Sequence, residues 1–336
     1  MLRLKSLLLQ LSVCWVCIPV SADWPQASGP DGNFIVSGNA VTDFSVALDE
    51  NVRWIAPLPS TGQGSVVVVG DRVFVTSHES VEADTEFGSD ILGLCFDAKT
   101  GDELWRRKIP GVRETDLSSL FSDNTAASPV ANREYVVFVN VGGSVQGFNH
   151  QGDLLWSRRW TPFGRHHARQ HEPFLVDDSI IISRVNLDDL PVNVTTKAGA
   201  KTLGRGLEYW NRLQERNMAT GELGWVAAAG TSVHSTSMSG RFADGTLGIV
   251  TGRGGGHQPP EEPFGLSMLK GSDGSVLWER ALKGYAAHQN AVWSPERVVA
   301  LVGDKHLTLD TMTGKTISEV SLRDNVVLTK QVEGRY

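Results

Sequence analysis

The chain has few cysteines: Cys14, Cys17 and Cys95 are the only three in 336 residues. The first two lie in an apolar stretch at the N-terminus, so the rest of the chain keeps only Cys95. A single remaining cysteine excludes an intramolecular disulfide and a metal site built from cysteines. Cys95 lies in the middle of the strand-like run Gly93–Phe96, where we expect a small buried hydrophobic side chain.

Positive charge is also scarce. The chain has 31 basic residues, and without Arg3 and Lys5 of the N-terminal stretch 29 remain against 38 acidic residues, a net charge of −9. A protein of this charge is repelled by the phosphates of nucleic acids and by an anionic membrane surface. We therefore expect no nucleic acid among its partners.

Long hydrophobic runs are limited to one, Leu7–Val20. It follows two basic residues and precedes the small-residue cleavage sequence Val20-Ser21-Ala22, which is the order of a secretory signal peptide. Gln10 interrupts the run, which is short for a membrane span. We expect residues 1–22 to be removed and residues 23–336 to form one domain without a transmembrane segment, periplasmic in a bacterium or secreted.

Glycine and tryptophan are present in number, with 35 and 10 copies, and they recur in a pattern. A strand-like run is followed by a glycine turn, and a tryptophan stands four residues after the glycine. The segments are Asp97–Trp105, His150–Trp156, Met218–Trp225 and Ser272–Trp278, and a fifth, Thr311–Ser318, keeps the turn without the tryptophan. The glycines lie 51, 69, 53 and 40 residues apart, so the repeats differ by inserted loops.

Each repeat reads as four strands. In the first repeat the strand-like runs are Gly64–Val69, Arg72–Ser77, Ile91–Phe96 and Glu103–Lys108. Four antiparallel strands in a unit of about 40–50 residues are typical of a β-propeller blade. The sequence therefore predicts an all-β propeller with about five complete blades and partial strands at both termini.

The repeated tryptophans have a structural interpretation. Each opens the outermost strand of its blade, where a large flat ring packs against the next blade. We expect this docking role for Trp54, Trp105, Trp156, Trp225 and Trp278. Two alternatives stay open for closing the ring: the termini jointly build a composite sixth blade, or the domain is incomplete at its C-terminus.

The Ala-x-Thr-Gly-x-x-x-Trp pattern and the opening Asp23-Trp24-Pro25-Gln26…Gly29-Pro30-Asp31-Gly32 resemble bacterial pyrroloquinoline-quinone-like (PQQ-like) β-propeller repeat proteins. The resemblance covers roughly residues 23–325. That family includes quinoprotein dehydrogenases, the outer-membrane assembly lipoprotein of the BAM complex and many secreted proteins. The resemblance thus implies two possible roles, an enzyme that uses PQQ and a scaffold that binds a partner.

The enzyme role lacks matching residues in this chain. Family dehydrogenases hold a metal-bound quinone and often cover it with a disulfide between adjacent cysteines, and residues 23–336 contain no such pair. No motif allows a catalytic aspartate or a set of metal ligands to be transferred to this sequence. A nucleophile elbow and an HExxH motif are absent as well. We therefore expect no cofactor, and only the family resemblance implies PQQ as a possible one.

A row of histidines is the first candidate site. Aligning the blade starts places His171, His234 and His288 at one position of three consecutive blades, with Glu172 beside the first. The first strand of a blade lines the central channel, so these rings can converge there. The alternatives are a metal site, a site for a polar or anionic ligand, and a structural role in which each ring bonds the backbone of a neighbouring blade.

A glycine-rich loop is the second candidate site. Gly252–Pro263 lies between two strands of the fourth repeat and contains His257, Glu261 and Glu262. A phosphate loop is excluded, because no Gly-Lys-Ser/Thr follows and two consecutive prolines prevent the helix that would hold the phosphate. The loop can still offer polar contacts to a partner.

These observations favour an exported, non-enzymatic propeller that presents loops for binding a protein or a polysaccharide. The alternative is a quinoprotein-like enzyme, or a binder of a small ligand or metal, that uses the central channel. A likeness of fold cannot decide between the two.

Overall fold

The computed structural model describes residues 23–36, 41–80, 88–112, 123–160, 171–185, 211–231, 236–253, 265–282, 292–302 and 304–322. Their strands form five four-stranded antiparallel sheets, named blades 1 to 5 in chain order. The strands, blade by blade, are β1 (Val67–Val69), β2 (Arg72–Ser77), β3 (Ile91–Asp97) and β4 (Glu103–Ile109); β5 (Val130–Ala131), β6 (Tyr135–Asn140), β7 (Ser144–Asn149) and β8 (Leu154–Arg159); β9 (Phe174–Val176), β10 (Ser179–Val185), β11 (Asn211–Asn217) and β12 (Leu223–Gly230); β13 (Met238–Arg241), β14 (Leu247–Arg253), β15 (Gly265–Lys270) and β16 (Val276–Ala281); and β17 (Val292–Trp293), β18 (Arg297–Val302), β19 (Lys305–Asp310) and β20 (Thr316–Ser321).

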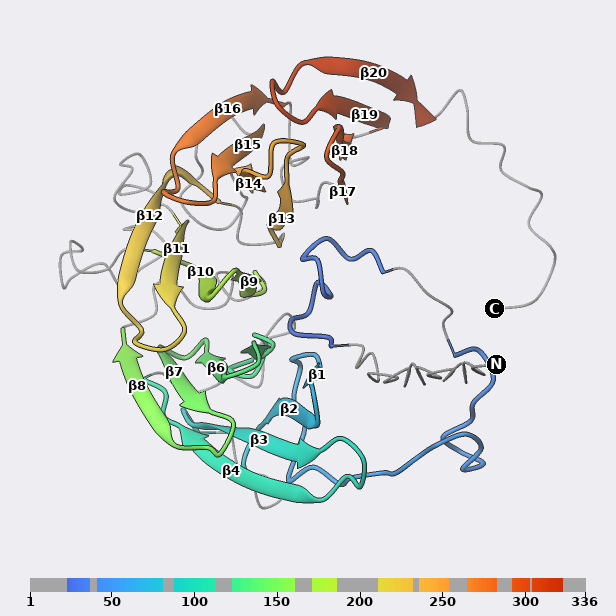
Figure 1. Cartoon of the computed structure of the whole chain (residues 1–336), viewed down its shortest axis with the longest axis vertical. Helices are drawn as coiled ribbons and strands as arrows, with labels where there is room; N and C mark the ends of the chain where they lie inside the picture. Colours follow the sequence, from blue (N-terminus) through green and yellow to red (C-terminus); the bar gives the residue numbers. More distant parts are fainter. Residues whose placement is uncertain are drawn as a thin grey trace, which may run out of the picture.

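The blades stand side by side around a common centre. Figure 1 shows the first strands β1, β9, β13 and β17 nearest the middle and the fourth strands β4, β8, β12, β16 and β20 on the outside of an arc. This confirms the predicted all-β propeller built from four-stranded antiparallel blades. None of the described ranges contains a helix with the length and apolarity needed to span a membrane.

The middle strands are apolar on both faces because each blade has a neighbour on either side. In β3 every residue from Ile91 to Phe96 is buried, as expected for a strand covered twice. Phe74 and Trp105 of blade 1 pack with Phe138 and Phe148 of blade 2 in one cluster. These side chains make tilted and edge-on ring contacts, with centroids 6.0 to 6.5 Å apart, a geometry that aromatic pairs prefer.

The glycine turn between the third and fourth strands is held by an acidic or amide side chain. In blade 1, Oδ1 of Asp97 accepts hydrogen bonds from the backbone N–H groups of Lys99 at 2.8 Å and Thr100 at 2.9 Å. Gly101 then adopts φ +77°, a conformation that glycine reaches without strain. Asn217 in blade 3 and Asp310 in blade 5 accept equivalent bonds, so one local sequence builds the same turn repeatedly.

Each docking tryptophan lies on the glycine turn of the following blade. The indole of Trp105 lies against Gly152, and its Nε1 donates to the carbonyl of His150 at 3.0 Å. The same pairing joins Trp54 to Gly101, Trp156 to Gly221, Trp225 to Gly274 and Trp278 to Gly314. Each of these four indoles likewise donates to a carbonyl just before its glycine, at 2.7 to 3.1 Å. A ring needs a residue without a side chain beneath it, so glycine and tryptophan recur together.

The antiparallel order gives each blade two different ends. The hairpin between the first and second strands and the glycine turn share one end, which we call the turn face. The connection between the second and third strands and the connection to the next blade share the other, which we call the loop face. The longest connection, residues 186–210 between β10 and β11, starts and ends at this face, and so does the connection 254–264 between β14 and β15.

Residues 23–36 run through the middle of the arc (Figure 1). They bond the first strands of four consecutive blades. In blade 1, Trp24 and Val68 exchange two backbone hydrogen bonds of 2.6 and 2.9 Å. In blade 2, Ala131 N–H donates to the carbonyl of Pro25 at 2.9 Å, and in blade 3, Leu175 N–H donates to Oε1 of Gln26 at 2.6 Å. In blade 4, Ser239 N–H donates to the carbonyl of Gly32 at 3.4 Å. The segment therefore covers inner strand edges that would otherwise keep unpaired backbone groups.

Candidate functional site

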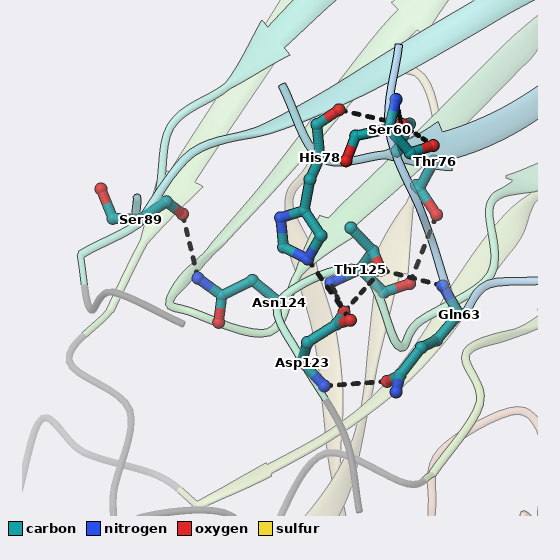
Figure 2. Close-up of polar contacts among 9 residues, drawn as sticks. Ser60, Gln63, Thr76, His78, Ser89, Asp123, Asn124 and Thr125 are labelled. Atoms are coloured by element: carbon teal, nitrogen blue, oxygen red, sulfur yellow. Dashed lines mark hydrogen bonds and ion pairs between the residues drawn. The ribbon is translucent and has the colours of Figure 1, made fainter. Parts of the chain in front are cut away.

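A buried histidine and an aspartate pair at the loop face between blades 1 and 2. His78 directly follows β2, and Asp123 lies seven residues before β5. Nε2 of His78 lies 3.3 Å from Oδ2 of Asp123, with side chains 1% and 18% exposed. Figure 2 shows the two groups pointing toward each other, with Gln63 and Thr125 beside them.

The other oxygen of Asp123 is also occupied. Oδ1 accepts from Thr125 through its backbone N–H at 2.7 Å and its Oγ1 at 2.5 Å. Burial raises the pKa of Asp123, but the bonds from His78 and Thr125 outweigh it and hold the pKa below its usual value. A carboxylate kept ionised in this way accepts a proton poorly near neutral pH.

Gln63 ties the segment before β1 into the same cluster. Its Oε1 accepts from the backbone N–H of Asp123 at 2.8 Å, and its own N–H donates to Oγ1 of Thr125 at 2.9 Å. Oγ1 of Thr76, in β2, donates to the carbonyl of Thr125 at 3.3 Å. The cluster joins two blades through groups that bond one another, which is the pattern of a structural anchor.

A second set of bonds repeats at one position of consecutive blades, two residues before the first strand. Ser65 N–H donates to Oγ of Ser128 at 2.8 Å, Ser128 N–H donates to Oε2 of Glu172 at 2.8 Å, and Glu172 N–H donates to Oγ1 of Thr236 at 3.1 Å. The relay links blades 1 to 4 near the centre of the arc. Burial raises the pKa of Glu172, and the bonds from Ser128 offset only part of that effect.

His171 lies in the junction between blades 3 and 4. Its Nε2 accepts from the backbone N–H of Ser237 at 3.1 Å and lies 2.9 Å from Oγ of Ser237. Nδ1 then carries the proton and donates to the carbonyl of Glu172 at 2.9 Å, a tautomer assigned from these contacts. Burial lowers the pKa of His171 to about 4, against the raising effect of its bond to Glu172.

The strand pairing changes the alignment of the histidine row. One residue of each first strand lies in the same row across the blade as the docking position of the fourth strand. In blade 1 this row is Val67, Phe74, Cys95 and Trp105. The equivalent first-strand residues of the other blades are Val130, Phe174, Met238 and Val292. His171 lies three residues before its strand, whereas His234 and His288 lie four residues before theirs. Counted from the first strands, His171 is therefore offset by one residue from His234 and His288, and the convergence of the three rings stays a prediction.

Five candidate residues lie outside the described part of the chain: His234, His288, His257, Glu261 and Glu262. Their proposed roles remain predictions. Of the channel set, the structure describes His171 and Glu172, whose polar atoms bond neighbouring blades through the contacts given above.

The described residues do not fit a metal-bound quinone. They contain no group of three histidine, cysteine, aspartate or glutamate side chains able to hold a metal ion. The middle of the arc, where first strands of several blades converge, is crossed by the chain's own residues 23–36 (Figure 1). Glu172, two residues before the first strand β9, already accepts a bond from Ser128 of blade 2.

A sequence profile described as the outer membrane protein assembly factor BamB matches residues 38–188. Over that part, which is less than half of the chain, the sequence is similar to PQQ-like β-propeller proteins. No curated protein matches it significantly over its sequence.

Among solved structures, this chain is similar to BamB from Moraxella catarrhalis, with 16% identity, a TM-score of 0.48, and coverage of 81% of this chain and 68% of that chain. It is also similar to a europium-containing methanol dehydrogenase, with 11% identity, a TM-score of 0.49, and coverage of 78% of this chain and 52% of that chain. A third similar structure is quinohemoprotein alcohol dehydrogenase from Comamonas testosteroni, with 14% identity, a TM-score of 0.54, and coverage of 89% of this chain and 49% of that chain. The chain thus spans about half the length of the two dehydrogenases, and at these identities the likeness concerns the fold alone.

Sequence reasoning missed the His78–Asp123 cluster and the central position of residues 23–36. The two members of the ion pair are far apart in sequence and belong to no motif, so no local signal marks them. The opening Trp-Pro-Gln motif indicated a family resemblance, but it did not indicate where residues 23–36 lie in the fold. Only the pairing of Trp24 with Val68 reveals its role.

Proposed function

We propose that the protein is an exported, non-enzymatic β-propeller that binds a protein partner on its loop face. Residues 1–22 act as the signal peptide, and residues 23–336 form one domain in the bacterial envelope or outside the cell. A polysaccharide is the other partner class that suits such a surface. The proposal concerns binding and assigns no reaction.

The central observation in support is that buried polar groups and the N-terminal segment join one blade to another. His78, Asp123, His171 and Glu172 each bond a neighbouring blade, and residues 23–36 bond four first strands. A reaction centre needs polar groups that can turn toward a substrate. Side chains committed to joining blades support a scaffold.

The placement of the long connections supports a partner on the loop face. The connections 186–210 and 254–264 start from the ends of β10 and β14, on the same face as His78 and Asp123. Binding residues concentrate on loops that a rigid scaffold positions. The match of residues 38–188 to a profile named for an outer membrane protein assembly factor favours a protein as the partner.

Photo-crosslinking in cells tests this proposal. A photoreactive amino acid replaces Val112, an exposed residue after β4 on the loop face, or Gln151, an exposed residue in the glycine turn of blade 2. We expect a discrete protein adduct from position 112 and none from position 151. Equal adducts from both faces, or none from position 112, would contradict a loop-face partner. A heterogeneous adduct that resists protease would indicate a polysaccharide.

A further inference from the structure

Blade 3 departs from the repeat at the position beside its docking tryptophan. The residue before the tryptophan is Leu104 in blade 1, Leu155 in blade 2 and Leu277 in blade 4, and Ile317 takes this place in blade 5. In blade 3 it is Gly224. This residue sits at the irregularity between β11 and β12, where the other blades place an exposed apolar side chain.

The residue paired with the tryptophan also differs in blade 3. Trp105 lies opposite Cys95, Trp156 opposite Gly147 and Trp278 opposite Met268, whereas Trp225 lies opposite Glu215. A Cβ added to Gly224 would overlap Oε2 of Glu215. The glutamate therefore occupies the space that the leucine fills elsewhere, and the two departures belong together.

A third departure removes an arginine. Arg107 lies over the ring of Trp105 with its guanidinium carbon 5.7 Å from the centroid, and Arg158 lies over Trp156 at 6.0 Å. Both arginines stand two residues after their tryptophan, and blade 4 has Arg280 at this position. Blade 3 has Ala227 instead. Blade 3 thus lacks the cation that accompanies the indole in two neighbouring repeats and carries a carboxylate beside it.

These changes border a cavity of about 630 Å³ at the turn face between blades 3 and 4. Its lining includes Glu215, Gly224 and Trp225 from blade 3 and Arg241, Lys270 and Asp273 from blade 4. We call it the Glu215 groove. Trp225 is half-buried and lines this cavity, whereas Trp105, Trp156 and Trp278 are buried.

The charges of the groove are unequal. Arg241 pairs with Asp177, and Lys270 pairs with Asp273 at 3.3 Å, so both bases of the lining have an acidic partner. Glu215 forms no ion pair of 4 Å or less with any residue in the described ranges. A partly sheltered carboxylate next to an indole therefore faces the cavity with a surplus of negative charge.

We propose that the Glu215 groove binds an arginine side chain of a protein or peptide ligand. A planar guanidinium forms two parallel bonds to a carboxylate and stacks on an aromatic ring, which a lysine ammonium does not do. Arg107 and Arg158 show that the chain already places guanidinium groups over equivalent indoles. This site lies on the face opposite the proposed partner surface and goes beyond the proposed function.

The test uses the pentapeptide acetyl-Gly-Ser-Arg-Gly-Ser-amide, its citrulline analogue, its lysine analogue and cellohexaose. Binding is followed through the indole N–H resonance of Trp225 in the nitrogen-15-labelled full protein, assigned by its loss in Trp225→Phe. We expect the arginine peptide to shift this resonance in a saturable manner, the lysine peptide to bind more weakly, and the neutral citrulline peptide to bind at least about tenfold more weakly, since a charged hydrogen bond contributes about 1.5–3 kcal/mol.

Three variants make the test specific. Glu215→Gln should weaken arginine-peptide binding at least about tenfold, and Gly224→Leu, which restores the repeat residue, should abolish it. Glu222→Gln changes an exposed acid of the same turn outside the groove and should leave binding unchanged. Thermal unfolding of each variant establishes that it is folded, and Glu215→Gln carries the conclusion if Gly224→Leu does not fold.

The outcomes separate the possible ligands. No saturable shift with the arginine peptide, equal binding of the citrulline peptide, or full binding by Glu215→Gln overturns the proposal. Saturable binding of cellohexaose without binding of the peptide would make the groove a saccharide site and also overturn it. Loss of arginine binding in Glu215→Gln with an unchanged adduct at position 112 would support two independent sites, so the two proposals can fail separately.

Discussion

The contact between tryptophan and glycine is the residue-scale unit of this fold. An indole lies on a glycine of the next blade and donates to a carbonyl just before it, five times in the described chain. The ring supplies a large apolar area, and its N–H finds an acceptor, so burial leaves no unpaired polar group. Two residue types thus determine how one blade meets another.

Trp105→Ala should lower the free energy of unfolding by roughly 3–5 kcal/mol, because it removes a buried indole and leaves a cavity between blades 1 and 2. Leu104→Ala, at a neighbouring position that is 44% exposed, is the control and should change it by about 0.5 kcal/mol or less. Urea unfolding of both variants measures the difference. Equal stability of the two variants would remove the docking role from Trp105.

His171 predicts a pH dependence of stability. Its pKa falls from 6.5 to about 4 in the folded protein because of burial, so the unfolded chain takes up a proton first as pH falls. The stabilisation is complete above pH 6.5 and is lost as pH falls through about 4, amounting to about 3 kcal/mol. Unfolding free energies of wild type and His171→Gln between pH 7 and 4 should therefore converge at low pH. Parallel profiles would show that the ring is not held neutral.

At the scale of elements, the N-terminal segment replaces a sheet neighbour. Residues 23–36 contain only one bridge residue, Trp24, yet they bond β1, β5, β9 and β13. Gly29 and Gly32 have φ +81° and +66°, and a Cβ on Gly32 would meet Oγ of Ser239. Glycine is required at position 32 both for the turn and for the close approach to blade 4.

Gln26 gives this element a specific test. Its side chain is 2% exposed, accepts from Leu175 N–H at 2.6 Å and donates to the carbonyl of Gly29 at 2.9 Å. Gln26→Ala leaves a buried amide without its partner and should cost roughly 1–3 kcal/mol. Native-state hydrogen exchange should show the amide of Leu175 losing protection in this variant and keeping it in Gln151→Ala, an exposed control. Unchanged protection of Leu175 would place Gln26 outside the channel.

The sequence predicted those parts of the fold that depend on local patterns. Apolar and alternating runs around Gly70 and Gly101 predicted strands β2, β3 and β4. This was possible because turns and apolar periodicity depend on residues close together in the sequence. The contacts of Gln26 with Leu175 and of His78 with Asp123 join distant parts of the chain. No residue-level signal encodes such partners. The one-residue offset of His171 from His234 and His288 is likewise not evident before the strands are paired.

At the scale of the whole molecule, the described blades form an arc with unequal ends. The outer strand β20 is exposed along almost its whole length, and Leu301 and Ile317 of blade 5 are 42% and 59% exposed. At the other end Trp54 and Ala56 pack against the apolar face of blade 1. The segment before β1 therefore covers blade 1 much as a neighbouring blade would, in agreement with its tryptophan.

The contacts that join the blades bear on the function that we propose. Residues 23–36 and the relay from Ser65 to Thr236 join blades at the middle of the arc, and the His78–Asp123 pair joins blades 1 and 2 at the loop face. The surfaces that we propose for ligands are the loop face and the Glu215 groove on the turn face. We propose, as the central claim, that this propeller is a binding scaffold and does not hold a quinone.

Equilibrium dialysis of pyrroloquinoline quinone with calcium against the purified protein tests that claim most directly. The account predicts no saturable retention of the quinone, because the chain's own N-terminal segment lies where first strands of four blades converge. Retention of one equivalent of quinone, seen as visible absorbance that bleaches when an alcohol is added, would contradict it and assign the protein to the quinoprotein enzymes.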